Sequence, residues 1–548
     1  MKTTRLLPVI LVALAAAAAA LTACSNSGSD SGALPPDAPV LNRALSTEPE
    51  SLDPQKSRSV QAADVLRDIG EGLVSYDASG EMVPATAQSW EISADGLTYT
   101  FRIRPGARWS NGDSVTATDF VFGLRRLVDP ATAAFYAAEL GNVVNAADIV
   151  AGKLEPGELG VSAKDERTLV ISLVRPTPYL LSLLTHPSTF PVHRGSIELH
   201  GDAFARAGNL VSNGAYVLAD WEPGAIIELH RNPHYWNDTE TSIDVVRHHI
   251  VTQEVAEFNR YRAGELHITS TVPPDNFDRI RAEYADQLHI APTLGVYYYG
   301  FNMTRPPFAD NPELRQALSM AIDREVLVEA IIGRGEAPAY SWVPPGIANY
   351  EPVQLSYADL SQQERNAIAQ SLYRKAGYSE ENPLRFELRY NTSDTQQRIA
   401  LAVQAMWRNV LGAEAQTVNV EFQVLLDQMR EREVTEVFRS SWFGDYNDAN
   451  TFLAIMQGDS AANMPGYSNA EYDELMRSAG EQLDLDRRRL YLEEAERVLL
   501  ANHVVIPLYF YVSKHLVKPE VEGWQDNILN YHYSQHLSLG AAEQDGRP

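Results

Sequence analysis

The sequence contains a single cysteine, Cys24, among its 548 residues. One thiol cannot form a disulfide bond within the chain, and a metal or redox centre built on several cysteines is excluded. The length is too great for one hydrophobic core, so two or three domains are expected. A hydrophobic content of 45% and a charged content of 21% are typical of a globular protein.

Positive charge is also scarce. The chain has 45 Lys and Arg residues against 72 Asp and Glu residues, a formal net charge of −27. This excess of carboxylates argues against nucleic acid and against anionic lipid as partners. It is compatible with a cationic ligand, although an ordinary solvated surface explains most of it.

Recognisable catalytic motifs are missing as well. There is no GxGxxG loop after a strand and no Walker A lysine loop. "GDSA" (458–461) lacks the strand–turn–helix setting of a hydrolase serine. "HRNPH" (230–234) has a proline between its histidines, and "DYNDAN" (445–450) lacks the glycine of a calcium loop. We therefore expect no enzyme activity, no metal and no cofactor.

Only one long apolar run occurs, close to the N-terminus. "MKTTR" is followed by "LLPVILVALAAAAAALTA" and then Cys24, and "LTAC" matches a bacterial lipobox. The pattern predicts a lipoprotein signal peptide over 1–23 and lipid attachment at Cys24. A membrane-spanning anchor is the alternative, because the run is nearly long enough. Residues 24–39, rich in Ser, Gly and Pro, predict a flexible tether. We expect an exported protein of the cell envelope, in the periplasmic space or on the outer face of the plasma membrane.

Helical and strand patterns are mixed along the rest of the chain. Residues 97–103 alternate between apolar and polar side chains, as in a half-buried strand, and Asp95-Gly96 before them predicts a hairpin turn. Thr116 and Asp119 have the spacing of a capping box. Helices are predicted over 315–333, 396–412 and 487–503, and strands over 418–426 and 504–513. The mixture favours α/β domains.

The stretch "SSWFGDYNDANTF" (440–452) raises a chemical question. Asp445 lies among Trp442, Phe443 and Tyr446, which are usually at least partly buried. A carboxylate in such surroundings needs a partner. The sequence leaves open whether that partner is another side chain, a metal or a ligand.

Segments spread over most of the chain carry a family resemblance. They include "TYTFRIRPGARWSNGDSVTATDFVF", "NGAYVLADWEPGAIIELHRNPHYW", "LRQALSMAIDREVLVE" and "VVIPLYFYV", in a consistent order between about Leu41 and Val517. The chain resembles the peptide-binding solute-binding proteins of ABC importers, of the oligopeptide-binding type. The resemblance implies an α/β, periplasmic-binding-protein-like two-lobe (Venus-flytrap) fold with an additional domain. The implied limits are residues 40–70, 194–294 and 513–548 for lobe I, 71–193 for the extra α/β domain and 295–512 for lobe II.

The resemblance also implies a peptide site. Asp445 matches the carboxylate that receives the peptide's α-amino group, and Arg439 matches an arginine that meets its C-terminal carboxylate. Gln396 stands where a basic residue can assist Arg439. The other implied contacts are the backbone of Val60, the aromatic walls Tyr136, Tyr298 and Tyr511, and Trp442 beside the carboxylate. Gly295 and Phe443 occupy two positions that a disulfide joins in some members.

The function that this family implies is non-enzymatic. Short peptides would be held in extended form, and the two lobes would close around them and present them to a permease and ATPase. A monomer is expected. One alternative is the same fold binding murein peptide or another non-standard solute. A weaker alternative is an exported peptidase, for which no catalytic motif is found.

Overall fold

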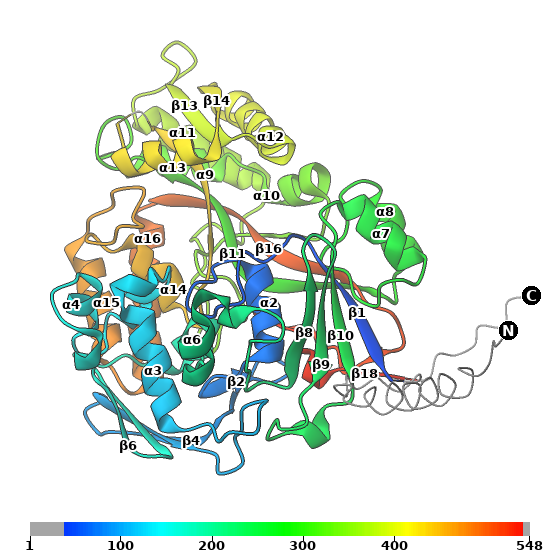
Figure 1. The fold of residues 1–548 in the computed structure, drawn as a ribbon. Coiled ribbons are helices and arrows are strands. Elements are labelled where there is room, and N and C mark those ends of the chain that lie inside the picture. Colours follow the sequence, from blue (N-terminus) through cyan, green and yellow to red (C-terminus); the bar gives the residue numbers. More distant parts are fainter. Residues whose placement is uncertain (1–37, 434, 541–548) are drawn as a thin grey trace, which may run out of the picture. The chain divides into compact units, whose positions relative to one another are not determined.

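The computed structural model describes residues 38–433 and 435–540 (Figure 1). The predicted signal peptide and the lipidation site Cys24 lie outside these ranges, as does most of the predicted tether. Helices alternate with strands that form two four-stranded sheets, one six-stranded sheet and two small two-stranded sheets. The predicted α/β class is therefore confirmed.

A four-stranded sheet brings the start of the described chain together with residues near 220–250. The strands lie side by side in the order β1 (Val40–Leu45), β10 (Val245–Ile250), β9 (Ile226–Arg231) and β8 (Tyr216–Glu222). Strands β1 and β10 are parallel, and the other neighbouring pairs are antiparallel. Helix α2 (Val60–Ile69) shares a buried apolar cluster with this sheet. The helix begins after Ser59, whose side chain accepts a hydrogen bond from the Ala62 amide. Its first residue, Val60, is 67% exposed.

A second four-stranded sheet contains β4 (Ala87–Ile92), β5 (Thr98–Ile103), β7 (Thr168–Ser172) and β6 (Val161–Asp165), in that order. Tyr99, Phe101 and Ile103 of β5 are buried, as the alternation predicts. Helix α3 (Ala117–Val128) packs against β6 and β7. The predicted capping box is confirmed, because the Asp119 carboxylate accepts from the backbone amide and the hydroxyl of Thr116 at 2.7 and 2.9 Å.

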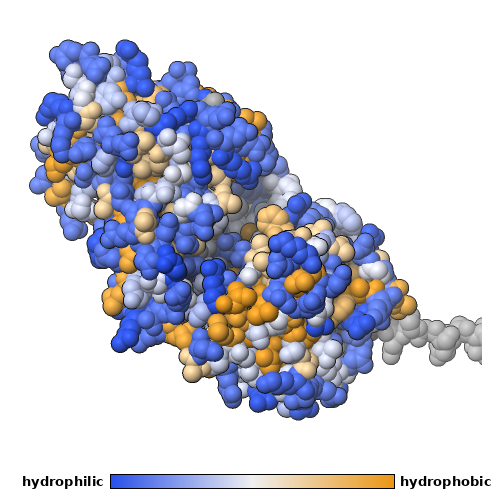
Figure 2. All heavy atoms as spheres, turned by 90° about the vertical axis from the view of Figure 1, so that its left-hand side faces the viewer, coloured by the Kyte–Doolittle hydropathy of each residue, from blue (hydrophilic) through white to orange (hydrophobic). Residues whose placement is uncertain are grey.

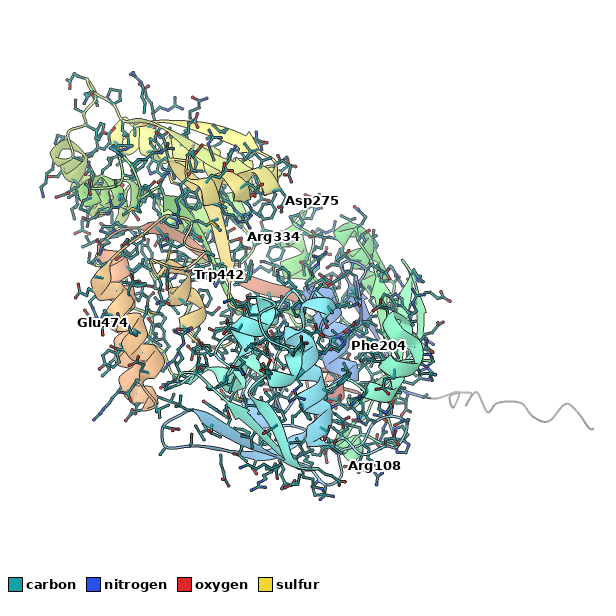
Figure 3. The ribbon with its side chains drawn as sticks, turned by 60° about the vertical axis from the view of Figure 1, so that its left-hand side comes forward. Arg108, Phe204, Asp275, Arg334, Trp442 and Glu474 are labelled. Atoms are coloured by element: carbon teal, nitrogen blue, oxygen red, sulfur yellow. The ribbon has the colours of Figure 1, made fainter. Side chains whose placement is uncertain are left out.

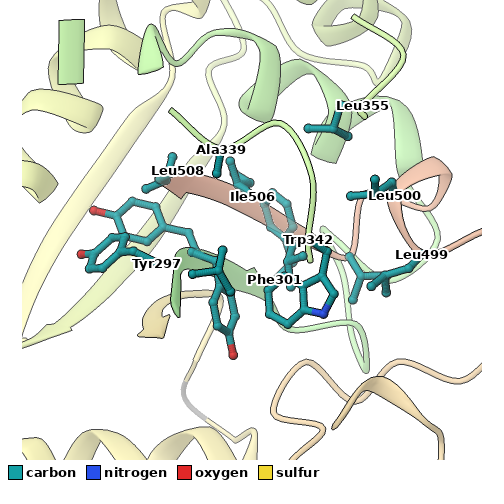
Figure 4. Close-up of a cluster of buried hydrophobic side chains, with 14 of the residues drawn as sticks. Tyr297, Phe301, Ala339, Trp342, Leu355, Leu499, Leu500, Ile506 and Leu508 are labelled. Carbon is teal, nitrogen blue, oxygen red and sulfur yellow. The ribbon is translucent and has the colours of Figure 1, made fainter. Parts of the chain in front are cut away.

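The six-stranded sheet is the largest. Its order is β12 (Ala337–Pro338), β16 (Val505–Leu516), β11 (Leu288–Phe301), β15 (Val437–Phe443), β13 (Arg385–Asn391) and β14 (Glu414–Val420). Tyr297, Phe301, Trp342 and Leu508 belong to the large core around it (Figure 4). The longer helices that contribute to this core are α9 (Pro312–Met320), α11 (Gln362–Lys375), α12 (Asp394–Leu411), α13 (Phe422–Glu431), α15 (Ala470–Glu481) and α16 (Leu485–Ala501).

Strands β11 and β16 are long enough to reach beyond the six-stranded sheet. They pair from Leu288–Leu516 at one end to Gly300–Val505 at the other, with irregularities between Pro292 and Val296 and between Tyr297 and Tyr298. Next to the first end, Val517 bridges to Ile268, which bridges in turn to Arg43 of β1. The two strands therefore run from the surroundings of one sheet into the centre of another. The domain limits given above remain predictions.

Two predicted elements differ from the structure. The helix predicted over 315–333 is interrupted: α9 ends at Met320, and the side chain of Asp323 caps a new helical segment by accepting from the Val326 amide. The strand predicted over 418–426 ends at Val420. Glu421 then caps α13, since its carboxylate accepts from the amides of Gln423 and Val424. In both places a local capping carboxylate outweighs the hydrophobic pattern.

Candidate ligand-binding site

Strand β15 has an open edge directly before Asp445. On one side, β15 pairs with β11 along its whole length, from Gly295–Phe443 to Phe301–Val437. On the other side, β13 pairs with it only at Leu388–Val437 and Arg389–Phe438. The backbone of residues 439–443 therefore has no partner strand on that side within the described parts of the chain. Trp442, near the end of this strand, is labelled in Figure 3.

A cavity of about 240 Å³ lies at the end of this strand. Val60, Tyr136 and Asp445 all line it, so the structure brings together three of the predicted site residues. The remaining wall combines apolar and aromatic residues, among them Phe443 and Tyr531, with His186, two serines and two arginines. Sequence reasoning missed His186 and Tyr531, which come from segments far from Asp445 and carry no local pattern of their own.

Asp445 has no cationic partner in the described part of the chain. Its backbone amide donates to the Thr451 hydroxyl over 3.2 Å, and that hydroxyl lies 3.4 Å from the carboxylate. Asp445 is an exposed residue, yet the cavity walls restrict the hydration of its carboxyl group and raise its pKa, while the Thr451 hydrogen bond lowers it. Two arginines line the same cavity, but Arg67 pairs with Asp64 at 3.1 Å and Arg58 forms no ion pair with Asp445.

A second carboxylate contributes to the field around Asp445. Glu139 has an exposed side chain, yet desolvation by the protein around it, followed by the negative charge of Asp445, raises the pKa of its carboxyl group to about 7. Neither carboxylate forms an ion pair with another described residue. Two negative charges close together favour the protonation of one of them or the binding of a cation. The face shown in Figure 2 is largely hydrophilic, with apolar side chains gathered in patches on it.

Arg439 forms a second cluster on one face of the six-stranded sheet. Its guanidinium lies over the Tyr297 ring, 4.9 Å from the centroid, and is 3.2 Å from the Asn391 side-chain oxygen and 3.3 Å from the Tyr511 hydroxyl. Tyr297 in turn donates to Gln396 in the first turn of α12. The structure thus brings Arg439, Tyr511 and Gln396 together. Arg439 is 9% exposed and has no carboxylate partner among the described residues, and its Nε has no acceptor there.

The structure places Tyr298 and Trp442 away from the lining of the Asp445 cavity. Tyr298 is 2% exposed, and its ring packs edge-on against Trp342 with centroids 4.8 Å apart. This differs from the predicted aromatic wall, because successive residues of a strand point to opposite faces and Tyr298 follows Tyr297. Trp442 likewise lies on the face of β15 opposite Arg439. It is half-buried, and its indole N–H has no acceptor within the described ranges.

Gly295 and Phe443 face each other across β11 and β15. A Cβ atom added at Gly295 would lie 2.7 Å from the Phe443 ring and 3.0 Å from the Tyr511 ring. Glycine at this position therefore leaves room for the Phe443 ring, which lines the Asp445 cavity.

Residues 81–464 match the family model for bacterial extracellular solute-binding proteins, family 5 middle region. The chain belongs to this family. It is 38% identical to the periplasmic oligopeptide-binding protein OppA of Salmonella typhimurium over 94% of each chain. Two solved structures are similar over 92% of this chain. The unliganded open form of MppA, a periplasmic murein tripeptide-binding protein, is 36% identical, matches over 98% of its own length and has a TM-score of 0.85. The Haemophilus influenzae OppA complex with the peptide RPPGFSPFR is 38% identical, matches over 99% of its length and has a TM-score of 0.74.

These relatives confirm the two-lobe solute-binding fold of family 5 that the sequence predicts. In the residues that the structure describes, no helix is long and apolar enough to cross a membrane. The same residues include no group of three or more His, Cys, Asp or Glu side chains arranged to hold a metal ion.

Proposed function

We propose that this chain is the lipid-anchored, substrate-binding component of an ABC importer. It captures short peptides in extended form and delivers them to a membrane permease and its ATPase. Membership of family 5 and the similarity to oligopeptide- and murein-peptide-binding proteins support the proposal. The observation that carries it is Asp445, a cavity carboxylate without a cation among the described residues.

Asp445 suits the α-amino group of a peptide. That group carries a positive charge and three N–H donors, and hydrogen bonds between charged groups are the strongest that proteins form. A ligand that fills the cavity displaces its water, so the carboxylate then depends on the ligand for a partner. Glu139, when ionised, adds negative charge that acts in the same direction.

The open edge of β15 suits the backbone of the same ligand. An extended peptide can add to an unpaired strand edge, and its main-chain hydrogen bonds then give affinity that does not depend on sequence. Residues 439–443 offer such an edge directly before Asp445. A peptide with its amino group at Asp445 would therefore run along β15.

Arg439 would receive the other end of a peptide of suitable length. A buried guanidinium without an anion favours a carboxylate, which it can bind through two parallel hydrogen bonds. Asn391, Ser441 and Tyr511 offer it only neutral oxygens, at 3.2 to 3.4 Å. The proposed ligand is thus a zwitterion, and a purely anionic solute would leave Asp445 unpaired.

The proposal also includes a lipid anchor and the closure of the two lobes. The lipobox at Cys24 and the periplasmic relatives support an exported protein held at the cell envelope. Closure of the lobes around the ligand, with bending where β11 and β16 pass between the predicted domains, would present the loaded form to the permease.

Mass spectrometry of the small molecules released on denaturing the purified protein tests the proposal. We expect a mixture of short peptides from the wild type and none from Asp445→Ala. Asp459→Asn, which changes an exposed carboxylate outside the cavity lining, should keep the peptides. Murein-type peptides alone would narrow the ligand class. A single non-peptide compound, or an unchanged mixture from Asp445→Ala, would contradict the proposal.

A further inference from the structure

Two histidines of this chain cap helical turns in the same way. The Nδ1 atom of His186 accepts the Ser188 backbone N–H at 3.2 Å, at the start of the short turn Pro187–Thr189, and lies 2.8 Å from the Ser188 hydroxyl, which donates to it in the same tautomer. The Nδ1 atom of His193 accepts the Ser196 backbone N–H at 3.1 Å, at the start of α6 (Arg194–His200). A nitrogen that accepts from a backbone N–H carries no proton. In a neutral ring, Nε2 is therefore the protonated nitrogen in both histidines.

The two Nε2–H groups have different surroundings. In His193 the Nε2 atom is 3.3 Å from the Asp113 carboxylate, so its proton has an acceptor. In His186 the Nε2 atom has no hydrogen-bond partner among the described residues. His186 lines the same cavity as Asp445, and its ring lies 4.3 Å from that of Tyr136. Burial, followed by the negative charge of the nearby Asp445, raises the pKa of Tyr136.

We infer that His186 is a ligand-binding residue whose Nε2–H donates to the first carbonyl oxygen of the bound peptide. The inference rests on the proposed function and adds to it. Asp445 alone would accept any ammonium group. An anion together with a neutral N–H donor on the same cavity wall selects an ammonium group with a carbonyl oxygen nearby, as in an α-aminoacyl group. The site would thereby distinguish peptides from simple amines and polyamines.

The charge state of His186 fits this role. Burial, followed by the positive charge of Arg67, lowers its pKa to about 3. The ring therefore stays neutral at the pH values where the protein would work, with one N–H to donate. A neutral donor also leaves the charge of Asp445 available for the ammonium group, whereas an imidazolium beside it would compete.

Calorimetric titration with two probes tests the inference. One probe is tetraalanine with free ends. The other is the same molecule with an (E)-alkene in place of the first peptide bond, which keeps the ammonium group and the length but has no first carbonyl oxygen. The variant is His186→Asn, because the asparagine oxygen can still cap the turn. His193→Asn is the matched control, since it changes an equivalent cap outside the cavity lining.

We expect His186→Asn to weaken tetraalanine binding about fivefold, in line with the loss of one neutral hydrogen bond. It should weaken binding of the alkene probe less than twofold, and His193→Asn should alter neither. Equal weakening of both probes by His186→Asn would assign the residue to packing or capping and overturn the inference. So would unchanged binding of both. If wild-type protein binds neither probe, the proposed function itself fails.

Discussion

Asp445 and Glu496 are carboxylates in opposite situations. Glu496 on α16 is fully buried and accepts hydrogen bonds of 2.6 to 2.9 Å from the amides of Trp342, Val343 and Val353 and from the Tyr350 hydroxyl. Asp445 meets solvent in a cavity, and Thr451 is its one hydrogen-bond partner in the described chain. The protein supplies every partner that Glu496 needs and leaves Asp445 almost without one.

This contrast separates a structural carboxylate from a ligand-binding one. Removing a buried group whose partners all come from the protein destabilises the fold, because those partners lose their acceptor. Removing a carboxylate that lacks protein partners changes the fold little, and its cost falls on the complex instead. Four predictions test this division, from the largest expected effect to the smallest.

Asp445→Asn should have the largest effect, on affinity. The ammonium group of a bound peptide would lose its counter-charge, at a cost of about 3–5 kcal/mol and hence roughly a hundredfold or more in dissociation constant. Calorimetric titration with a short peptide measures the change. The variant should unfold at nearly the wild-type urea concentration. A similar loss in Asp459→Asn would show that the effect is not specific to the cavity.

Glu496→Gln should act on stability instead. Its amide nitrogen would face N–H groups that now donate to a carboxylate, so the free energy of unfolding should fall by about 3 kcal/mol. Urea denaturation measures this fall. Peptide affinity of the folded protein should stay within about twofold, because Glu496 is not among the residues that line the Asp445 cavity. If Glu496→Gln unfolded at the wild-type urea concentration, the division into a structural and a ligand-binding carboxylate would be wrong.

Arg439→Gln should weaken the binding of peptides with a free C-terminus by about tenfold, provided that the peptide is long enough to reach residue 439. The same peptides with an amidated C-terminus should bind the variant and the wild type alike, because they offer no carboxylate. A series of two- to six-residue peptides in both forms would identify the length that Arg439 serves. Equal weakening of both forms would indicate that Arg439 only supports the sheet.

Lowering the pH should weaken peptide binding modestly. Partial desolvation by the cavity walls raises the pKa of Asp445, and desolvation together with the charge of Asp445 raises the pKa of Glu139 to about 7. Glu139 takes up a proton in the free protein as the pH falls from 7 to 5, whereas a bound ammonium group favours the charged forms of both carboxylates. We expect affinity to fall about three- to tenfold over this interval, with solvent screening limiting the effect. Proton release, measured by calorimetry in buffers of different ionisation enthalpy, should be smaller in Asp445→Asn.

Local sequence patterns predicted those parts of the fold in which neighbouring residues determine the outcome. The alternation of Tyr99, Phe101 and Ile103 and the capping box of Thr116 both involve contacts within a few residues. The same locality explains the errors. Hydrophobic spacing extended a strand through Glu421, although a side-chain cap at that residue starts a helix.

The candidate site was less predictable, because it depends on contacts between distant segments. The resemblance pointed to Val60, Tyr136 and Asp445, which share one cavity. It could not show on which face of a strand Tyr298 lies, since one residue along a strand reverses the side chain. Tyr531 belongs to a segment far along the chain, and no pattern around it indicates that it reaches this cavity.

The contact between Gly295 and Phe443 has a consequence for engineering. A larger residue at 295 would push against the Phe443 ring, and that ring is 53% exposed and borders the cavity around Asp445. Alanine, serine and valine at 295 therefore form a graded series that displaces the ring by increasing amounts. Such a series could retune which ligand sizes the protein accepts, while every group proposed to contact the ligand's charged ends keeps its identity.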